Sequence, residues 1–196
     1  TGGKVRPEEI VLSESGNCLY RQLSEKRRKG TPSFIFEENS ETRLMLYCKA
    51  VEECLSRGET ALMLFPEIGL SLEMRALLYR YFGNAVAVCH GKLSQKERYQ
   101  IFKRVSCGEI KVLVGSRAAL FMPFRKLGLI IVDEERDPSY YSAAMPRYNT
   151  ITIAQKYADL SDADLIISDE IPSVAAVKKT ETGEWTGIHN APCFVR

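Results

Sequence analysis

The sequence predicts one α/β domain, a mostly parallel sheet with helices on both faces. From Ser33 onward, short apolar segments alternate with amphipathic segments of ten or more residues, which is typical of right-handed strand–helix–strand units. The run Leu127–Val132 contains five apolar residues and one glycine, as expected for a strand covered on both faces. At 196 residues, with 45% hydrophobic and 27% charged residues, the chain suits one domain with a sizeable core.

Charge and cysteine content exclude several classes of protein. A net charge of +2 is too balanced to mark a nucleic-acid binder by its overall field, so any basic surface must be local. The six cysteines form no C-x-x-C pair, and we expect neither a zinc site nor a disulfide framework. No signal peptide and no apolar run of about 20 residues is present, so we expect a cytoplasmic protein with no membrane partner and no bound metal. The abrupt first and last residues are those expected of a piece of a longer protein.

Residues 1–32 are predicted to form an extension or linker with one basic helix at 18–29. Its last residues, 26–29, carry four positive charges in a row. They suit either a solvated helix end or a contact with nucleic acid.

Residues 33–196 are predicted to form a single lobe. Strands are expected at 33–36, 60–65, 85–90, 110–114, 127–132 and 165–168. Helices are expected at 40–57, 71–82 and 94–106, the last opened by the capping box Ser94-x-x-Glu97.

Polar residues follow the predicted strands at their carboxyl ends, where ligands bind in open α/β sheets. Asp133 and Glu134 follow the run 127–132, an arrangement that suits a nucleoside triphosphatase: the first acid holds Mg²⁺ through water and the second orients the attacking water. A solvated acidic turn is the alternative. The loop 115–117 offers backbone amides, a hydroxyl and a guanidinium to a phosphate, although an isolated loop arginine more often forms a surface salt bridge.

Several segments in one order and spacing resemble a known family. They are FPEIGL at 65–70, HGKLSQKER at 90–98, VGSRAALF at 114–121 with PF at 123–124, LGLIIVDEE at 127–135, and DPSY at 137–140 with PRY at 146–148. Together they resemble the PriA family of superfamily 2 DNA helicases, also called primosomal protein N′, which restart stalled replication. The resemblance covers about residues 33 to 175.

The resemblance implies the first RecA-like lobe of such a helicase, a fold of the P-loop NTPase type. It implies that Asp133 and Glu134 are the metal and water acids. It further implies that two loops bind DNA. One contains Gly115, Ser116 and Arg117. The other, which couples DNA to ATP, contains Tyr140, Arg147 and Tyr148. Tyrosine and arginine faces are also suited to stacking on unpaired bases. Ordinary packing of these tyrosines against the sheet is the alternative.

The chain departs from the family at the phosphate loop, which should read Gly-x-x-Gly-x-Gly-Lys-Thr. The glycine positions fall on Glu37, Ser40 and Thr42, the lysine position on Arg43 and the metal-binding hydroxyl position on Leu44. Ser40, Thr42 and Arg43 are therefore candidates for a degenerate nucleotide site only. The acids Asp133 and Glu134 are expected to persist as a vestigial strand-end feature, paired with Arg43 across the rim.

The leading hypothesis is a replication-restart lobe that does not hydrolyse ATP. Its partners would be single-stranded or forked DNA, or primosome and replication proteins, and no cofactor is predicted although the family uses ATP and Mg²⁺. One alternative is an active DNA-dependent ATPase that uses Arg43 and a remodelled loop. The other is an interaction scaffold that has lost DNA binding as well.

Overall fold

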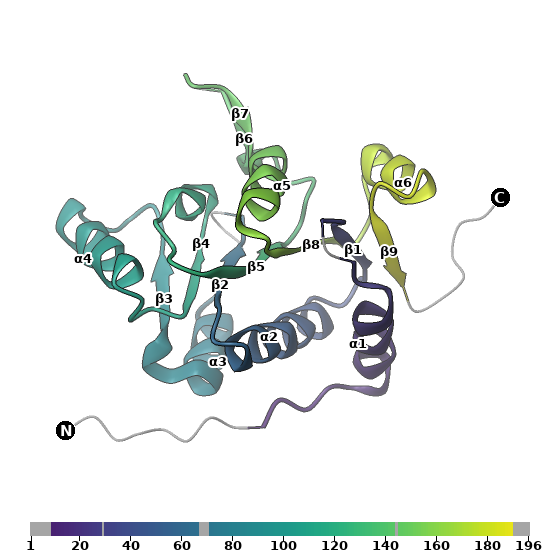
Figure 1. Ribbon diagram of the computed structural model, residues 1–196, viewed down its shortest axis with the longest axis horizontal. Coiled ribbons are helices and arrows are strands. Elements are labelled where there is room, and N and C mark those ends of the chain that lie inside the picture. The colour runs from purple at the N-terminus through teal and green to yellow at the C-terminus, as the bar shows by residue number, and fades with distance from the viewer. Residues whose placement is uncertain (1–8, 29, 67–70, 144, 190–196) are drawn as a thin grey trace.

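A computed structural model describes residues 9–28, 30–66, 71–143 and 145–189 (Figure 1). Within this part of the chain, seven parallel strands form one sheet in the order β3-β4-β2-β5-β8-β1-β9. The strands are β1 (Ser33–Phe36), β2 (Thr60–Leu64), β3 (Val86–Cys89), β4 (Val112–Gly115), β5 (Leu127–Val132), β8 (Asp164–Asp169) and β9 (Thr186–His189). Strands β6 (Tyr141–Ser142) and β7 (Tyr148–Asn149) form a separate antiparallel hairpin, which projects beyond the sheet in Figure 1.

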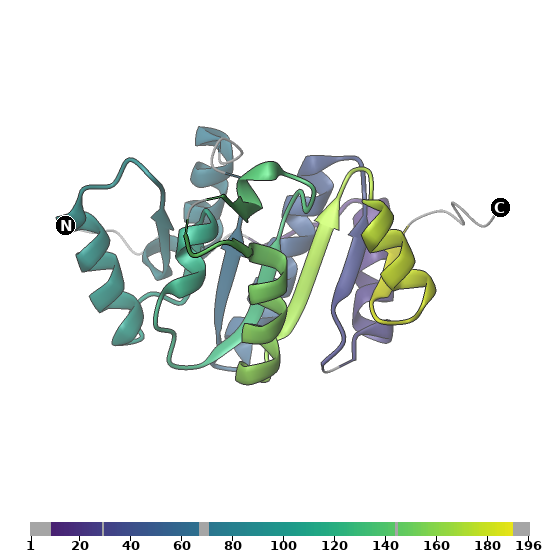
Figure 2. The same ribbon diagram turned by 90° about the horizontal axis from the view of Figure 1, so that it is seen from above.

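Helices cover both faces of the sheet, which confirms the predicted fold class. They are α1 (Glu14–Lys26), α2 (Ser40–Ser56), α3 (Leu72–Phe82), α4 (Gln95–Ser106), α5 (Thr150–Ser161) and α6 (Val174–Glu181). Helices α1, α2 and α3 pack into one hydrophobic core, and α4, α5 and α6 contribute to the other. Figure 2 shows α4 at one end of the molecule and α6 at the other.

Strand β5 is the central strand of the sheet, as predicted. It pairs with β2 on one side and β8 on the other, and all six of its residues are buried. Alternate residues face the two cores: Ile130 and Val132 face one, and Leu129 and Ile131 the other. The carboxyl end of β5 therefore emerges at the middle of one rim of the sheet, next to the loops that follow β1, β2 and β8.

The N-terminal helix differs in extent from its prediction. It begins at Glu14 because the Ser13 side chain caps it, accepting a hydrogen bond from the amide of Gly16. Leu19 and Leu23 are buried in the same core as α2, so α1 packs onto the sheet domain. The predicted domain boundary at residue 32 stays a prediction.

Several elements after residue 140 are not anticipated by the sequence pattern. They are helices α5 and α6, strand β9 and the β6–β7 hairpin. Helix α5 opens with four β-branched residues, which have low helix propensity, but Asn149 caps it by accepting hydrogen bonds from the amides of Ile151 and Thr152. No helix in the described ranges combines the length and apolar character needed to cross a bilayer.

Candidate functional site

The loop between β1 and α2, which the resemblance assigns to the phosphate loop, forms hydrogen bonds with its own side chains. The Asn39 side chain accepts a hydrogen bond of 2.8 Å from the amide of Thr42, capping α2. The Glu37 carboxylate in turn accepts a bond of 3.0 Å from the amide of Asn39. Two amides that would face an anion at this helix N-terminus are therefore bonded within the loop.

Arg43 lies buried at this rim, with its side chain 2% exposed. Its Nε donates to Asp133 Oδ1 at 2.9 Å, and its Nη1 donates to the carbonyl oxygen of Glu37 at 2.7 Å. Burial lowers the pKa of the guanidinium, but the charge and hydrogen bond of Asp133, together with Tyr47 and Glu134, outweigh burial and raise the pKa. The expected pairing of Arg43 with the acids across the rim is confirmed, since Glu134 Oε1 also lies 3.9 Å from Arg43 Nη2.

Asp133 receives two further donors at the same oxygen. The Tyr47 hydroxyl donates to Oδ1 at 2.7 Å and the Ser168 hydroxyl at 3.0 Å, and these two hydroxyls are also in contact with each other. Burial and the charge of Asp133 raise the pKa of Tyr47 well above its usual value, so Tyr47 stays a neutral donor. We call Arg43, Tyr47, Asp133 and Ser168 the buried rim cluster.

Tyr47 and Ser168 were not singled out by the sequence. Tyr47 lies four residues after Arg43, so both side chains project from the same face of α2. Ser168 lies near the end of β8, the strand next to β5. The sequence indicated them only through their positions. Tyr47 places a hydroxyl one helical turn beyond Arg43, and Ser168 places another at the end of the strand next to β5.

Glu134 differs from Asp133 in its surroundings. Its backbone has φ 53°, a left-handed conformation that is uncommon for a residue with a side chain. Its side chain is 46% exposed, and burial together with the charge of Asp133 raises the pKa of its carboxyl group. Glu134 thus faces the rim as a partly solvated acid, whereas Asp133 is enclosed.

The residues after Glu134 tie this turn to the end of β8 and the start of α6. The amide and the Nε of Arg136 both donate to the Asp169 carboxylate, at 3.1 and 3.4 Å. The buried Glu135 side chain accepts a bond of 3.0 Å from the amide of Ser173, the N-cap residue of α6. The acidic turn is therefore a fixed structural junction rather than a solvated loop.

The loop after β4 is held by packing and by backbone contacts. A Cβ atom at Gly115 would overlap the carbonyl oxygen of Cys89, so only glycine fits there. Ser116 is buried, and Arg117 Nη1 donates to the carbonyl oxygens of Ser139 and Tyr141, at 2.9 and 3.0 Å. Arg117 thus clamps the segment that follows the acidic turn. A role of this loop in DNA binding stays a prediction.

The three residues expected to couple DNA to ATP lie in different environments. Tyr140 is fully buried, and its hydroxyl donates to the carbonyl oxygens of Asp133 and Leu64, at 2.7 and 3.1 Å. The expectation that its ring stacks on a base is corrected by this burial, because the ring has no exposed face. Arg147 is exposed on the hairpin, and the half-buried Tyr148 packs edge-on against Phe121 with ring centroids 5.5 Å apart.

The groups at the rim that would face ATP·Mg²⁺ have partners within the protein or are apolar. Asp133 Oδ1 already accepts three hydrogen bonds, and the position that should offer a hydroxyl to magnesium is the apolar, buried Leu44. Among the described residues, no group of three or more His, Cys, Asp or Glu side chains is placed to hold a metal ion.

Comparison with curated proteins finds sequence relatives over most of the chain. The chain is 33% identical to replication restart protein PriA of Helicobacter pylori (strain 26695) over 176 residues, 90% of this chain and 28% of that protein. It is 36% identical to PriA of Treponema pallidum over 187 residues, and 34% identical to PriA of Bacillus subtilis over 138 residues. These matches cover 87% and 70% of this chain, and 28% and 17% of those proteins. The chain thus spans less than a third of the length of these relatives.

Solved structures confirm the RecA-like fold, at sequence identities too low to indicate more. The Pyrococcus furiosus Hef helicase domain aligns with a TM-score of 0.63 and 18% identity, over 90% of this chain and 38% of that chain. RecG bound to a three-way DNA junction aligns with a TM-score of 0.61 and 15% identity, over 98% of this chain and 26% of that chain. The UvsW helicase of bacteriophage T4 aligns with a TM-score of 0.60 and 15% identity, over 97% of this chain and 62% of that chain. No family model matches the chain.

Proposed function

Because this chain is related in sequence to the PriA replication restart proteins, we propose that it is a RecA-like lobe that serves replication restart without hydrolysing ATP. By this proposal it corresponds to the first lobe of the helicase and acts by binding single-stranded or forked DNA, or by docking replication proteins. The alternatives are an active DNA-dependent ATPase and a scaffold without DNA binding.

The observation that carries the proposal is the buried rim cluster. A Walker-type aspartate acts through a carboxylate that is open to water and Mg²⁺. In this chain that carboxylate is paired with the Arg43 guanidinium and accepts two hydroxyl donors as well, and Asp133 is only 5% exposed. Metal binding at Oδ1 would displace the Arg43 guanidinium, and breaking a buried ion pair costs about 3–5 kcal/mol.

Charge at the first loop supports the same conclusion. The Glu37 carboxylate bonds to the amide of Asn39, at the entry to the helix where a phosphate would lie. A carboxylate about 4 Å from a phosphate is unfavourable by roughly 4 kcal/mol at an effective dielectric near 20. A helix N-terminus offsets only about 0.3–1 kcal/mol of this repulsion. Arg43 does not neutralise the phosphate, since it is committed to Asp133 and to the Glu37 carbonyl oxygen.

A DNA-stimulated phosphate-release assay tests the proposal, with Glu134→Gln as the matched control. Glu134 is the acid that would orient the attacking water, and it is partly exposed, so its replacement by the isosteric amide leaves the cluster intact. We expect wild type and variant to release phosphate at the same background rate. Turnover by the wild type that Glu134→Gln abolishes would establish the active ATPase instead.

DNA binding is tested separately, by anisotropy of a labelled single strand. Arg147 is the suitable probe because it is exposed, whereas removing Arg117 would release the carbonyl oxygens that it holds. We expect weak, salt-sensitive binding that Arg147→Ala weakens for all sequences alike. No binding by the wild type at low salt would favour the scaffold.

A further inference from the structure

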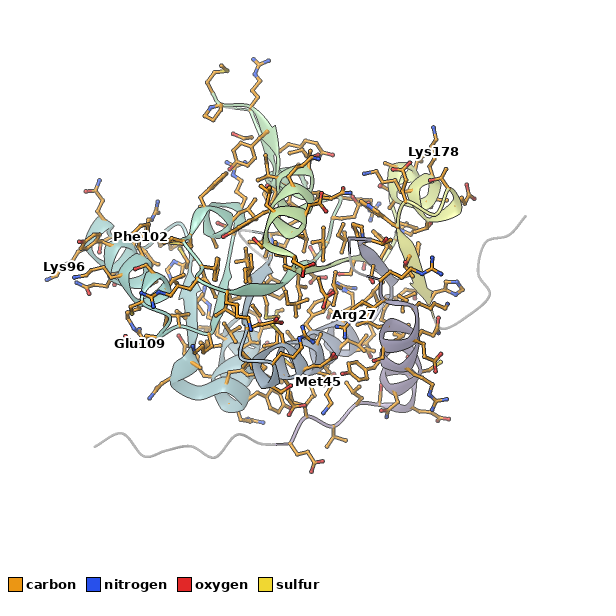
Figure 3. The ribbon with its side chains drawn as sticks, in the orientation of Figure 1. Arg27, Met45, Lys96, Phe102, Glu109 and Lys178 are labelled. Carbon is orange, nitrogen blue, oxygen red and sulfur yellow. The ribbon has the colours of Figure 1, made fainter. Side chains whose placement is uncertain are left out.

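We propose that the outer face of α4 is a second binding surface for single-stranded nucleic acid, separate from the rim contacts described above. We define the α4 outer face as Lys96, Tyr99 and Lys103, flanked by Phe102. Figure 3 shows Lys96 pointing away from the rest of the molecule at one end of the domain. The proposal stands independently of the rim, because it concerns a different element and different side chains.

The exposure of α4 is the first observation. It covers the edge strand β3, and Val105 is its one buried residue. Lys96, Tyr99 and Lys103 follow one another at spacings of three and four residues, which places them along one stripe of the helix. Two large rings are exposed here: Tyr99 is 58% exposed and Phe102 43% exposed.

The charge on this face is the second observation. Neither Lys96 nor Lys103 forms an ion pair with any residue that the structure describes, and Lys103 Nζ lies 5.7 Å from the centre of the Tyr99 ring. The two neighbouring acids are engaged elsewhere: Glu97 accepts bonds from the amide and hydroxyl of Ser94, and Glu109 pairs with Arg104 at 2.7 Å. Lys96 and Lys103 are therefore left without an acid paired to them among the described residues, although Glu97 keeps its negative charge on the same helix.

Charge and aromatic surface together favour one class of partner. A single strand offers a phosphate backbone to the lysines and unpaired bases to the exposed rings. A duplex would satisfy the lysines, but its bases are stacked on one another and unavailable to Tyr99. An acidic protein would satisfy the lysines as well, without requiring the rings.

Salt dependence of binding to a labelled oligothymidylate tests the lysines. Because each phosphate neutralised on a single strand contributes about 0.7 to the slope of log K against log salt, Lys96→Ala with Lys103→Ala should lower the slope by about 1.4. The charge-matched control is Lys156→Ala with Lys178→Ala, two exposed lysines on α5 and α6. Figure 3 shows Lys178 on α6, at the opposite end of the domain from Lys96. We expect this control to keep the wild-type slope.

Replacement of the exposed ring tests the single-strand assignment. Tyr99→Ala should weaken binding of the single strand at least about fivefold and leave duplex binding unchanged. The control is Tyr79→Ala on α3, where the ring is 46% exposed but has no part in the α4 face. All four variants change exposed residues, and thermal unfolding checks that each keeps the wild-type fold.

Three results would overturn the proposal. One is an unchanged salt slope in the Lys96→Ala, Lys103→Ala variant, or an equal change in its control. Another is no binding of the oligothymidylate by the wild type at about 50 mM salt. The third is an affinity for poly-glutamate that equals or exceeds the affinity for the single strand and is lost in the Lys96→Ala, Lys103→Ala variant. This result would assign the face to an acidic protein. If only Arg147→Ala weakens DNA binding, the α4 surface is rejected while the proposed function stands.

Discussion

Replacing Arg43 with Met is expected to destabilise the protein far more than the loss of an ordinary ion pair. The variant keeps a long apolar stem but removes the charge that compensates Asp133, which stays 5% exposed with two neutral hydroxyl donors. Removing one partner of a buried pair costs about 3–5 kcal/mol, because the remaining charge is buried without compensation. The bond from Arg43 to the Glu37 carbonyl oxygen is lost as well, which places the loss toward the upper part of this range.

Urea unfolding followed by circular dichroism measures this loss. Folded domains are stable by only about 5–15 kcal/mol, so a loss of this size lowers the urea midpoint markedly at unchanged slope. For a domain of this size, each kcal/mol corresponds to about 2–4 °C in melting temperature, so we expect a fall of roughly 6–20 °C.

Arg104→Met is the matched control for this experiment. Arg104 pairs with Glu109 at 2.7 Å, but the two side chains are 39% and 56% exposed. Exposed pairs contribute about 0–1 kcal/mol, so this variant should unfold close to the wild type. Equal effects of Arg43→Met and Arg104→Met would refute the reasoning, since the Asp133 carboxylate would then be solvated and open to a metal.

Three further predictions concern the same rim. Tyr47→Phe removes one donor to Asp133 and should cost about 1–3 kcal/mol in urea unfolding, and a neutral effect would show that the hydroxyl is dispensable. Burial and the neighbouring Asp133 charge raise the pKa of Glu134 in the folded protein. The protonated carboxyl group therefore contributes to folding stability, and this contribution is complete below the unfolded-state pKa near about 4.3. The contribution is lost as the pH rises through the raised pKa of the folded state. Glu134→Gln should therefore melt higher relative to wild type at neutral pH than at pH about 4, and a difference independent of pH would contradict the raised pKa. Gly115→Ala should destabilise by about 1–3 kcal/mol because its Cβ meets the backbone of β3, whereas Gly91→Ala, with open space around its Cβ, should change stability by less than about 1 kcal/mol.

Much of the fold was predictable because hydrophobic burial sets its pattern. Strand β5 could be placed at 127–132 from its apolar run, and α4 could be started correctly from its capping box. Helix α5 was missed because its first turn is rich in β-branched residues and its buried residues are two alanines, one threonine and one isoleucine. The short elements α6 and β9 have too few residues for a periodic signal to stand out.

The site was predictable only in part, because burial of a polar or aromatic side chain depends on contacts distant in sequence. The pairing of Arg43 with Asp133 followed from counting back along the phosphate loop. Tyr47 had the spacing of an apolar stripe, and the local sequence gives no sign that its hydroxyl meets a carboxylate 86 residues away. For Tyr140 the sequence left two alternatives, stacking on a base and packing against the sheet, and its hydroxyl bonds to two carbonyl oxygens in the interior.

The central claim is that this rim does not bind ATP with Mg²⁺. Isothermal titration calorimetry of this chain with ATP and Mg²⁺ tests that claim most directly. Asp133 is already bonded to Arg43, Tyr47 and Ser168, and the amides of Asn39 and Thr42 are bonded within their own loop. We predict no saturable heat with ATP concentrations up to the millimolar range, where a binding free energy of about −4 kcal/mol would be detected. Saturable binding with a micromolar dissociation constant, about −8 kcal/mol, would contradict the account.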